Sequence, residues 1–391
     1  MKITIVTESF IGYMSNQTSG DIFGGQEILL YRTCKVLMEA GHDVVVIQFG
    51  KERKDFFYED IRIIQVKERK FRFLEKLGFV RRWTWASFFL NPYIEKDTDW
   101  VHFHNHHFSF PHSLWLKKYI LTGMNHGVEW DLPWVYSKLS LRNLKERFSF
   151  ILLRAVTRFS VRNLNKIYTN DLFFIHYTTL KKPQLQNKFV YIPNFVRESF
   201  KPDVQPHKII SEKFKNKKIL LLPKMPMKER GTDIMFDIMV DLKDKGFVLV
   251  ITSTSSGAPY WIKECEKMNL NDCVYFTGHM STDDLISVYA ASDIVVIPSP
   301  CREATAITML ETMAMKKPLV LSNIGGLPEV GRNGYNCLLR NANKKEFMQA
   351  ILELDSNPNL ANEISQNGYD YVTKAFNTKI WDKAILNFFT K

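Results

Sequence analysis

The sequence predicts an α/β protein with parallel sheets, and three observations lead to this fold class. Short apolar runs rich in β-branched residues recur from end to end, without the polar–apolar alternation that marks a half-exposed strand. Helical patterns separate many of these runs; one of them, residues 26–40, is closed by Gly41. The chain of 391 residues is too long for one ordinary core and suits two domains of about 200 residues each.

The apolar runs predict the strands of two sheets. In the first half we expect strands at residues 2–6, 43–47, 61–66, 100–104, 120–125 and 166–169. In the second half we expect strands at residues 219–222, 248–252, 273–277, 293–297 and 319–322. Between the halves, the polar residues 201–206 are punctuated by prolines and are typical of a linker. The sequence therefore predicts a first domain at 1–198, a second at 199–373, and a C-terminal helix at 374–391 that could cross back to the first domain.

The composition excludes several classes of protein. Hydrophobic residues make up 45% of the chain and charged residues 24%, which excludes global disorder and a coiled coil. No apolar run reaches the ~18 residues that cross a bilayer, and the apolar N-terminus is too short for a signal peptide. The five cysteines form no Cys-x-x-Cys pair, which argues against a disulfide framework or a zinc ribbon. We therefore expect a cytoplasmic protein.

The net charge of +12 predicts an anionic partner, which could be nucleic acid, anionic lipid or a phosphorylated small molecule. Two segments of the first half concentrate this charge. Residues 67–93 contain seven basic and two acidic side chains, residues 138–166 contain eight and one, and apolar residues lie between them. This pattern suits helices on an anionic membrane, so we expect peripheral contact with the inner face of the cell membrane. The alternative is an ordinary solvated helix face whose apolar side joins the core.

The most informative stretch is residues 298–311, which read Pro-Ser-Pro-Cys-Arg-Glu-Ala-Thr-Ala-Ile-Thr-Met-Leu-Glu. It follows a predicted strand, and we expect it to open a helix that continues through Ala314. Glu303 and Glu311 would then project from roughly one side of this helix, ~12 Å apart along its axis. The free N–H groups of a first helical turn bind anions. A nucleotide-sugar fits this arrangement, with its pyrophosphate at the helix start, its sugar near Glu303 and its ribose hydroxyls near Glu311.

The Glu303-x7-Glu311 pattern resembles the donor-site signature of retaining family 4 glycosyltransferases. It is followed by Lys-Pro-Leu-Val at 317–320 and Gly-Gly-Leu-Pro-Glu at 325–329, which also belong to that signature. The resemblance covers most of the second half and is weaker in the first half. It implies the GT-B fold, in which two Rossmann-like domains with parallel sheets face across a cleft. The donor would then lie on the second domain and the acceptor on the first.

The resemblance also implies which residues form the site. Members of the family hold the donor pyrophosphate with two cations six residues apart, and Lys224 and Arg230 stand there in swapped order. The segment at Gly24 and Gly25 is similar to a glycine turn near the donor phosphates, and His126 matches the active-site histidine. The implied catalytic residues are His126, Glu303, Lys224 and Arg230. The implied donor-binding residues are Gly24, Gly25, Lys224, Arg230, Met280, Glu303, Thr305, Ala306, Ile307, Thr308 and Glu311.

The implied reaction moves a sugar from a nucleotide-diphosphate sugar to an acceptor hydroxyl, with retention at the anomeric carbon. The transferred group would be hexosyl-like, although Ala306 stands where the family usually has glycine and adds a methyl group near the sugar. We expect a saccharide or lipid-linked saccharide of polysaccharide biosynthesis as acceptor, and no cofactor or metal. Nucleic acid is not expected as a partner, because the chain contains no recognisable nucleic-acid-binding module.

Two alternative functions remain open at this point. One is a GT-B-type nucleotide-sugar epimerase or hydrolase. The other is a metal-dependent hydrolase that uses the histidine cluster at residues 102–112, because His102, His104 and His106 would share one face of a strand. The sequence Asp-Thr-Asp at residues 97–99 matches the motif of metal-dependent GT-A transferases, but it precedes a predicted strand instead of following one, so we expect it to form a turn.

Overall fold

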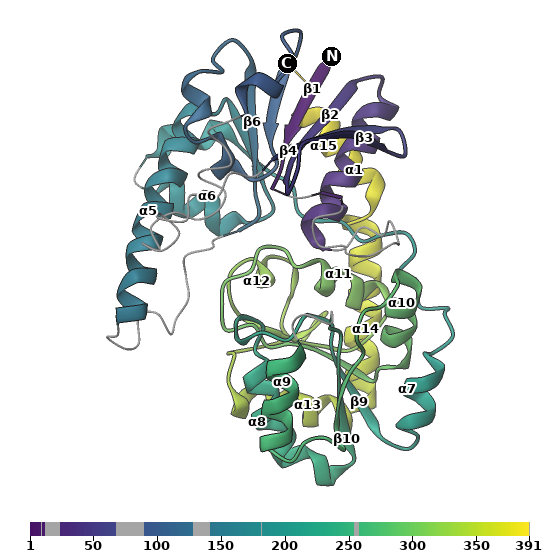
Figure 1. Ribbon diagram of the computed structural model, residues 1–391. Coiled ribbons are helices and arrows are strands. Elements are labelled where there is room, and N and C mark those ends of the chain that lie inside the picture. The colour runs from purple at the N-terminus through teal and green to yellow at the C-terminus, as the bar shows by residue number, and fades with distance from the viewer. Residues whose placement is uncertain are drawn as a thin grey trace. The chain divides into compact units, whose positions relative to one another are not determined.

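The computed structural model describes residues 1–8, 10–11, 24–67, 90–127, 141–180, 182–253 and 258–390. The chain forms two compact units, Met1–Pro193 together with Asp382–Lys391, and Asn194–Trp381 (Figure 1). The boundary between them lies at Pro193–Asn194, whereas the sequence predicts it at residue 198. The end of the C-terminal helix belongs to the first unit.

The first unit contains an eight-stranded sheet with the order β3-β4-β2-β1-β5-β6-β7-β8. Neighbouring strands are parallel, except that β3 is antiparallel to β4. The strands are β1 (Lys2–Val6), β2 (Asp43–Gly50), β3 (Lys54–Tyr58), β4 (Ile61–Lys67), β5 (Trp100–Phe103), β6 (Ile120–Asn125), β7 (Lys166–Thr169) and β8 (Phe189–Tyr191). The sequence does not predict β3 and β8, because these edge strands are partly exposed and lack a buried apolar run.

Helices pack on both faces of this sheet. They are α1 (Gly25–Glu39), α5 (Leu141–Asn163), α6 (Leu172–Thr179) and the end of α15 (Thr378–Phe388), with short 3-10 helices η2 (Asn91–Tyr93), η3 (His106–Ser109), η4 (His112–Leu114) and η5 (Pro183–Lys188). Successive side chains of a strand point to opposite faces. On β5, Val101 joins the core cluster that includes Leu153 of α5, whereas the ring of Trp100 contacts Phe389 at 5.4 Å. Thus α5 and the C-terminal residues cover opposite faces.

The second unit contains a six-stranded parallel sheet with the order β11-β10-β9-β12-β13-β14. The strands are β9 (Lys218–Leu222), β10 (Phe247–Ile251), β11 (Val274–Phe276), β12 (Ile294–Ile297), β13 (Leu319–Ser322) and β14 (Leu338–Arg340). The helices are α7 (Lys208–Lys213), α8 (Thr232–Leu242), α9 (Ala258–Lys267), α10 (Thr282–Ala291), α11 (Ile307–Ala314), α12 (Leu327–Val330), α13 (Lys344–Ser356) and α14 (Pro358–Ala375), with η6 (Lys228–Arg230) and η7 (Lys243–Lys245). This strand order is that of a Rossmann fold.

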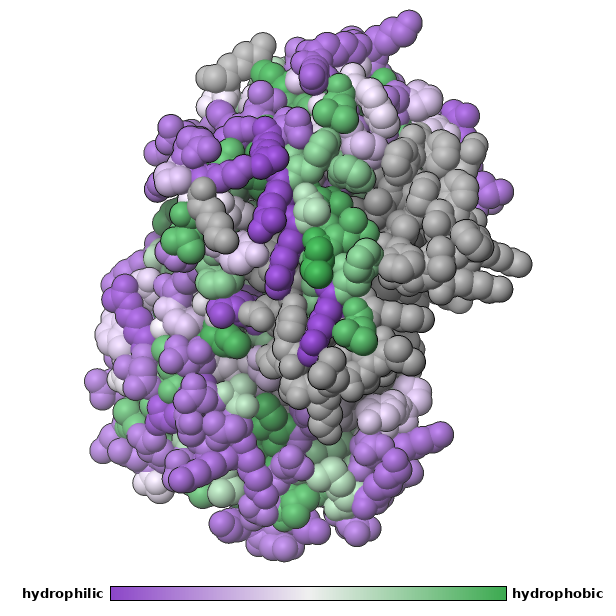
Figure 2. Space-filling view, turned by 90° about the vertical axis from the view of Figure 1, so that its left-hand side faces the viewer, coloured by the Kyte–Doolittle hydropathy of each residue, from purple (hydrophilic) through white to green (hydrophobic). Residues whose placement is uncertain are grey.

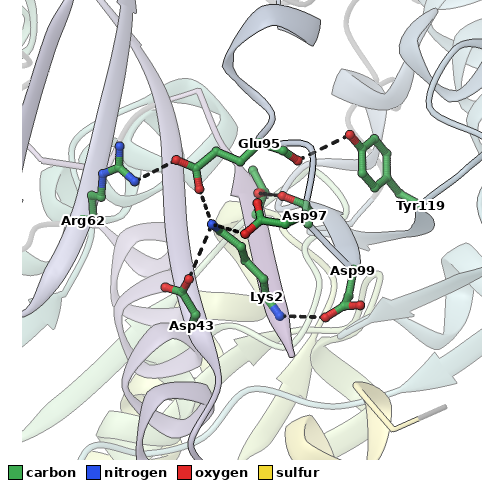
Figure 3. Close-up of polar contacts among 9 residues, drawn as sticks. Lys2, Asp43, Arg62, Glu95, Asp97, Asp99 and Tyr119 are labelled. Carbon is green, nitrogen blue, oxygen red and sulfur yellow. Dashed lines mark hydrogen bonds and ion pairs between the residues drawn. The ribbon is translucent and has the colours of Figure 1, made fainter.

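An ion-pair network ties together the amino end of β1 and the turn before β5 (Figure 3). The Nζ atom of Lys2 lies 2.5 Å from Glu95 Oε2 and 3.0 Å from Asp97 Oδ2, and its backbone N–H donates to Asp99 at 2.9 Å. Arg62 of β4 binds the other carboxylate oxygen of Glu95 at 2.8 Å. Hydrogen bonds with Glu95 and Asp97 raise the pKa of Lys2 to about 12. The Asp-Thr-Asp sequence therefore lies in the predicted turn before β5, where its two aspartates bind Lys2.

Two further observations bear on the expectations from composition. Within the described residues, no helix combines the length and the apolar character that crossing a bilayer requires. All five cysteines are buried and have free thiols.

Candidate active site

The strand order of the second unit creates a position for a ligand between β9 and β12. From β9 the chain adds strands in one direction, to β10 and β11, and from β12 it adds them in the other, to β13 and β14. Where the order reverses, the carboxyl ends of the two strands leave a crevice in which α/β proteins bind ligands. The loop after β9 carries Lys224, and the loop after β12 carries Glu303.

Three of the predicted catalytic residues meet at this position. Lys224 Nζ binds Glu303 Oε2, and Arg230 Nη1 lies 3.0 Å from Glu303 Oε1. Ser299, at the end of β12, donates its hydroxyl to the same carboxylate. The side chains of Lys224 and Glu303 are 8% and 9% exposed, and that of Arg230 is 40% exposed. The structure therefore brings together residues that are 79 positions apart in the chain.

The electrostatics of this cluster favour an anionic ligand. Burial by itself would raise the pKa of Glu303, but the charges of Lys224 and Arg230 outweigh it and lower that pKa to about 2. Burial lowers the pKa of Lys224 to about 8, although the Glu303 carboxylate acts in the opposite direction. At neutral pH the cluster thus holds one negative charge against two positive charges. The excess positive charge is what a diphosphate requires.

The prediction that Glu303 lies at the start of a helix is wrong. Helix α11 begins at Ile307, and Glu303 lies in the preceding loop. The loop carbonyl groups bind other parts of the chain: Gly326 N–H donates to Glu303 O at 2.6 Å, and Asn194 Nδ2 donates to Thr305 O at 2.5 Å. Because these tertiary hydrogen bonds replace the i to i−4 bonds of a helix, the segment remains a loop, and its Glu303 side chain binds the two cations.

Four predicted donor-binding residues do lie at the start of α11. Thr305 and Ala306 precede the helix, Ile307 and Thr308 are its first residues, and no side chain caps this end. The Thr308 hydroxyl is buried without a hydrogen-bond partner among the residues that the structure describes. The N–H groups and the helix dipole make this end a site for an anion. Met280, also predicted, lies after the edge strand β11 and is half-buried against the core.

Glu311 lies in the middle of α11 and is 3% exposed. Its Oε1 accepts a hydrogen bond from Arg197 Nη2 at 2.6 Å, and its Oε2 accepts one from the Tyr289 hydroxyl at 3.3 Å. Burial raises the pKa of Glu311, even though Arg197 and Tyr289 stabilise the ionised form. Each oxygen of the carboxylate that is predicted to bind ribose therefore has a partner in the protein.

In the first unit, His126 follows strand β6, at the carboxyl edge of the sheet. Its Nε2 binds the backbone oxygen of His104 at 2.8 Å. A carbonyl oxygen can only accept, so Nε2 carries the proton. Burial lowers the pKa of His126 to about 4, so the ring is neutral at pH 7. Asn125 fixes the adjoining turn, because its Oδ1 accepts from Gly127 N–H at 3.0 Å.

The glycine turn of the first unit lies at the start of α1. Gly24 is the residue before the helix and has φ of +103°, which favours glycine. Gly25 is the first helical residue, so only Gly24 forms the turn itself. His104 Nε2 binds the backbone oxygen of Gln26 at 3.0 Å, and His104 O in turn binds His126. His104 therefore connects the glycine turn with His126.

The expectation that three histidines share one face of a strand is wrong. Strand β5 ends at Phe103, and His106 lies in η3. His102 instead binds the Thr122 hydroxyl at 3.0 Å, and His107 binds the Thr157 hydroxyl at 2.8 Å. Burial lowers the pKa of both His102 and His106 to about 3. In the described part of the chain, His, Cys, Asp and Glu side chains form no group of three or more that could hold a metal ion.

One of the two basic segments can be placed in the structure. Most of segment 67–93 lies outside the described residues, but segment 138–166 contains α5. The inner face of α5 is buried through Phe150, Leu153 and Val156. Its outer face exposes a stripe of apolar side chains, formed by Leu144, Phe148, Ile151 and Leu152. Figure 2 looks onto this side of the molecule, where apolar surface lies beside strongly hydrophilic side chains.

Sequence reasoning missed the residues that hold the predicted ones in place. Asn194 and Arg197 follow the unit boundary and contact the loop and the helix of the Glu303-x7-Glu311 stretch. Ser299 and Tyr289 complete the two carboxylate environments. No spacing pattern could reveal Asn194 and Arg197, because they lie 111 and 114 positions from their partners.

Comparison with known proteins matches both halves of the chain to glycosyltransferase families. Residues 23–199 match the family described as Glycosyltransferase Family 4, and residues 203–371 match Glycosyl transferases group 1. An uncharacterized glycosyltransferase of Methanocaldococcus jannaschii is 30% identical over 183 residues, which cover 46% of this chain and 45% of that protein. The chain spans between about a fifth and three fifths of the first curated relatives that it matches.

Solved structures resemble the chain over nearly its whole length. Sucrose-phosphate synthase of Thermosynechococcus elongatus gives a TM-score of 0.78 at 17% identity, covering 99% of this chain and 98% of that one. Anabaena HepE in complex with UDP-glucose gives 0.71 at 15% identity, covering 99% of both chains. The chain therefore has the GT-B fold, and each half matches a glycosyltransferase family.

Proposed function

We propose that this protein is a retaining glycosyltransferase that moves a hexose from a nucleotide-diphosphate sugar to an acceptor hydroxyl. The observation that carries the proposal is the convergence of Lys224 and Arg230 on Glu303, at the strand-order reversal of the second unit and beside the start of α11. The two family matches and the UDP-glucose complex of HepE support the same donor class.

In this proposal, the donor diphosphate replaces the Glu303 carboxylate as the partner of Lys224 and Arg230. In the free protein both cations bind Glu303. When the diphosphate binds Lys224 and Arg230, the Glu303 carboxylate is released to accept hydrogen bonds from the sugar hydroxyls. The two cations and the N–H groups of α11 then stabilise the charge that develops on the departing diphosphate. No metal ion or cofactor is required, because side-chain cations and the helix start supply the positive charge.

The other predicted residues complete the donor site. Glu311 binds the ribose hydroxyls, and Thr305, Ala306, Ile307 and Thr308 place the diphosphate and sugar at the start of α11. The methyl group of Ala306 restricts the space around the sugar, and Met280 borders the nucleoside. In the first unit, the proposal assigns Gly24 and Gly25 to the donor phosphates and His126 to the transferred sugar.

The acceptor in this proposal is a lipid-linked or cell-surface saccharide, and the protein works at the inner face of the cell membrane. The outer face of α5 supports this location, because its apolar stripe continues into the exposed Arg158 and Arg162. Such a face suits the boundary between anionic headgroups and acyl chains. The proposal includes segment 67–93 in the membrane contact because of its basic and apolar sequence.

The decisive experiment has two stages. Isothermal titration calorimetry with UDP, GDP and ADP identifies the nucleotide, and we expect one of them to bind with micromolar affinity. The matching nucleotide-sugars are then incubated with membrane extracts, and labelled product is followed by mass spectrometry and by NMR of the new anomeric proton. If the transferred sugar has the same anomeric configuration in the product as in the donor, the reaction proceeds with retention. Release of free sugar or an epimerised nucleotide-sugar, without transfer, would support the hydrolase or epimerase alternative.

A further inference from the structure

The segment just after the unit boundary holds both parts of the donor motif. Asn194 Nδ2 donates to the backbone oxygen of Thr305, in the loop that carries Glu303. Three residues later, Arg197 Nη2 donates to Glu311 Oε1 on helix α11 at 2.6 Å. Residues 194–197 therefore contact the loop and the helix of the same motif, although they are more than a hundred positions away in the chain.

Arg197 is itself held in a fixed position. Its guanidinium group lies 4.5 Å from the centre of the Phe200 ring, and its Nη1 lies 3.3 Å from the Thr282 hydroxyl at the start of α10. The residue before it, Val196, donates its N–H to Phe376 O at 2.8 Å, which ties the segment to the C-terminal end of α14. An arginine that is already positioned loses little conformational entropy when it binds a carboxylate.

The surroundings of Glu311 explain why a cation is needed there. The described titratable or charged groups that face its carboxylate are Arg197, from the segment after the boundary, and the Tyr289 hydroxyl, from α10. Arg197 is 20% exposed and Glu311 is 3% exposed. A carboxylate buried to this extent loses most of its hydration, and an isolated one would be neutralised by protonation.

The hydrogen bonds of the Glu311 carboxylate leave acceptor positions for a ligand. An ionised carboxylate offers about two acceptor positions on each oxygen. Arg197 uses one position on Oε1, and Tyr289 uses one on Oε2. Counting the described residues alone, one position on each oxygen is left, and the pair matches two neighbouring hydroxyl groups. A protonated Glu311 would offer fewer acceptor positions and would bind such a diol less well.

We propose that Arg197 is a positioning residue of the donor site, which keeps the Glu311 carboxylate charged and turned so that both oxygens can accept the ribose hydroxyls of the nucleotide. The identity of the ligand rests on the proposed function, but the ion pair and its burial do not. Arg197 is predicted to set the nucleotide affinity and its pH dependence without touching the nucleotide.

The first test needs no ligand and uses four full-length proteins: wild type, R197M, E311Q and R197M/E311Q. Urea unfolding is measured at about pH 5.5 and about pH 8. Without Arg197, the folded-state pKa of Glu311 rises further above its unfolded value, so stability falls as the pH increases. Relative to wild type, we expect R197M to lower the folding constant at least about tenfold more at the higher pH than at the lower pH. The E311Q background should abolish this pH-dependent loss.

The second test measures the dissociation constant of UDP for the same proteins by calorimetry, with R197K as the conservative variant. We expect R197M to weaken UDP binding about tenfold or more, increasingly so above neutral pH, and R197K to restore much of the affinity. In the E311Q background, R197M should have little further effect, because the two residues act as one unit. R332M is the matched control, since Arg332 also lies against a ring, that of Tyr371, in the same unit.

Several results would overturn the inference. An R197M effect that is equal at both pH values, or that survives in the E311Q background, would show that Arg197 does not act through the Glu311 charge. Additive losses of UDP affinity would assign Arg197 a direct contact with the ligand. If wild type binds none of UDP, GDP and ADP, the proposed function and the nucleotide role of Arg197 both fail. The unfolding cycle then still decides whether Arg197 holds Glu311 ionised.

Discussion

At the scale of residues, the proposed donor site contains a carboxylate, Glu303, that forms ion pairs with two cations. Lys224 and Arg230 both bind Glu303, so neither needs to be moved far to meet a diphosphate. We predict that K224A and R230A each lower kcat about a hundredfold or more, because each removes one preorganised group that stabilises the leaving diphosphate. Steady-state kinetics with the cognate donor measures the effect. K245A, which removes an exposed lysine in η7, should retain wild-type turnover; near-normal kcat in K224A or R230A would remove that residue from the mechanism.

The pKa of Lys224 makes a second residue-level prediction. Burial lowers this pKa to about 8, so in the free protein the ammonium loses its proton as the pH rises through that value. Because a diphosphate binds the charged form, UDP affinity should fall between about pH 7 and pH 9.5. Calorimetric titrations across this range provide the measurement. K224R keeps its charge throughout, so its UDP affinity should be nearly constant over the same range. A wild-type profile as flat as that of K224R would contradict the prediction.

The family resemblance assigns Lys224, Arg230 and Glu303 to one site, but it does not predict the residues that support them. The structure brings these three side chains into contact. Arg197 carries no local signal in the sequence, because its partner Glu311 lies 114 positions away and only the fold joins them. The histidine cluster shows the converse: four histidines in six residues suggest a metal site, yet His102 and His107 bind threonine hydroxyls.

At the scale of elements, the loop before α11 depends on glycines packed against it. A Cβ atom on Gly325 would lie 2.5 Å from Glu303 O, and Gly325 has φ of +61°. We predict that G325A displaces the loop and weakens UDP binding about tenfold or more, beyond the ~1 kcal/mol cost of a left-handed alanine. G246A is the matched control, because Gly246 has φ of +82° with nothing within 4 Å of its Cβ position. It should lose similar backbone stability and keep UDP affinity. Equal UDP affinity in both variants would show that the loop tolerates displacement.

The helices and strands also show which element bounds the sequence predicts and which it does not. Buried strands such as β1 and β6 have the predicted bounds, because an uninterrupted apolar run leaves few alternatives. The start of α11 is predicted several residues too early, because hydrogen bonds from Asn194 and Gly326 hold the loop before Ile307 outside the helix. Local propensity cannot register competition from segments that are distant in the chain.

At the scale of the whole molecule, each half of the chain carries its own sheet and its own role in the proposal. The strand order of the second unit reverses between β9 and β12, and this reversal brings together the residues after these two strands that the proposal assigns to the donor site. Apolar runs and a polar linker were enough to predict two α/β domains. The strand order itself could not be read from the runs, because parallel strands have similar sequences wherever they lie in the sheet.

The last prediction concerns membrane binding by helix α5, which belongs to the first unit. We expect the full-length protein to bind vesicles of anionic lipid and to bind neutral vesicles much less. Each exposed arginine near an anionic surface contributes ~1 kcal/mol, and the apolar stripe of α5 adds burial in the headgroup region. Replacing Ile151 and Leu152 by serine, or Arg158 and Arg162 by glutamate, should reduce co-sedimentation with these vesicles.

Salt should weaken the binding, since exposed charges are screened beyond ~8–10 Å at ordinary ionic strength. UDP affinity should be unchanged in both α5 variants, because none of the residues that the proposal assigns to the donor lies in α5. Replacing Tyr260 and Ile262 by serine provides the matched control, since these exposed apolar residues belong to α9 of the second unit. If the control and the α5 variants lose binding equally, or if anionic and neutral vesicles recover the same amount of protein, the outer face of α5 is an ordinary solvated surface.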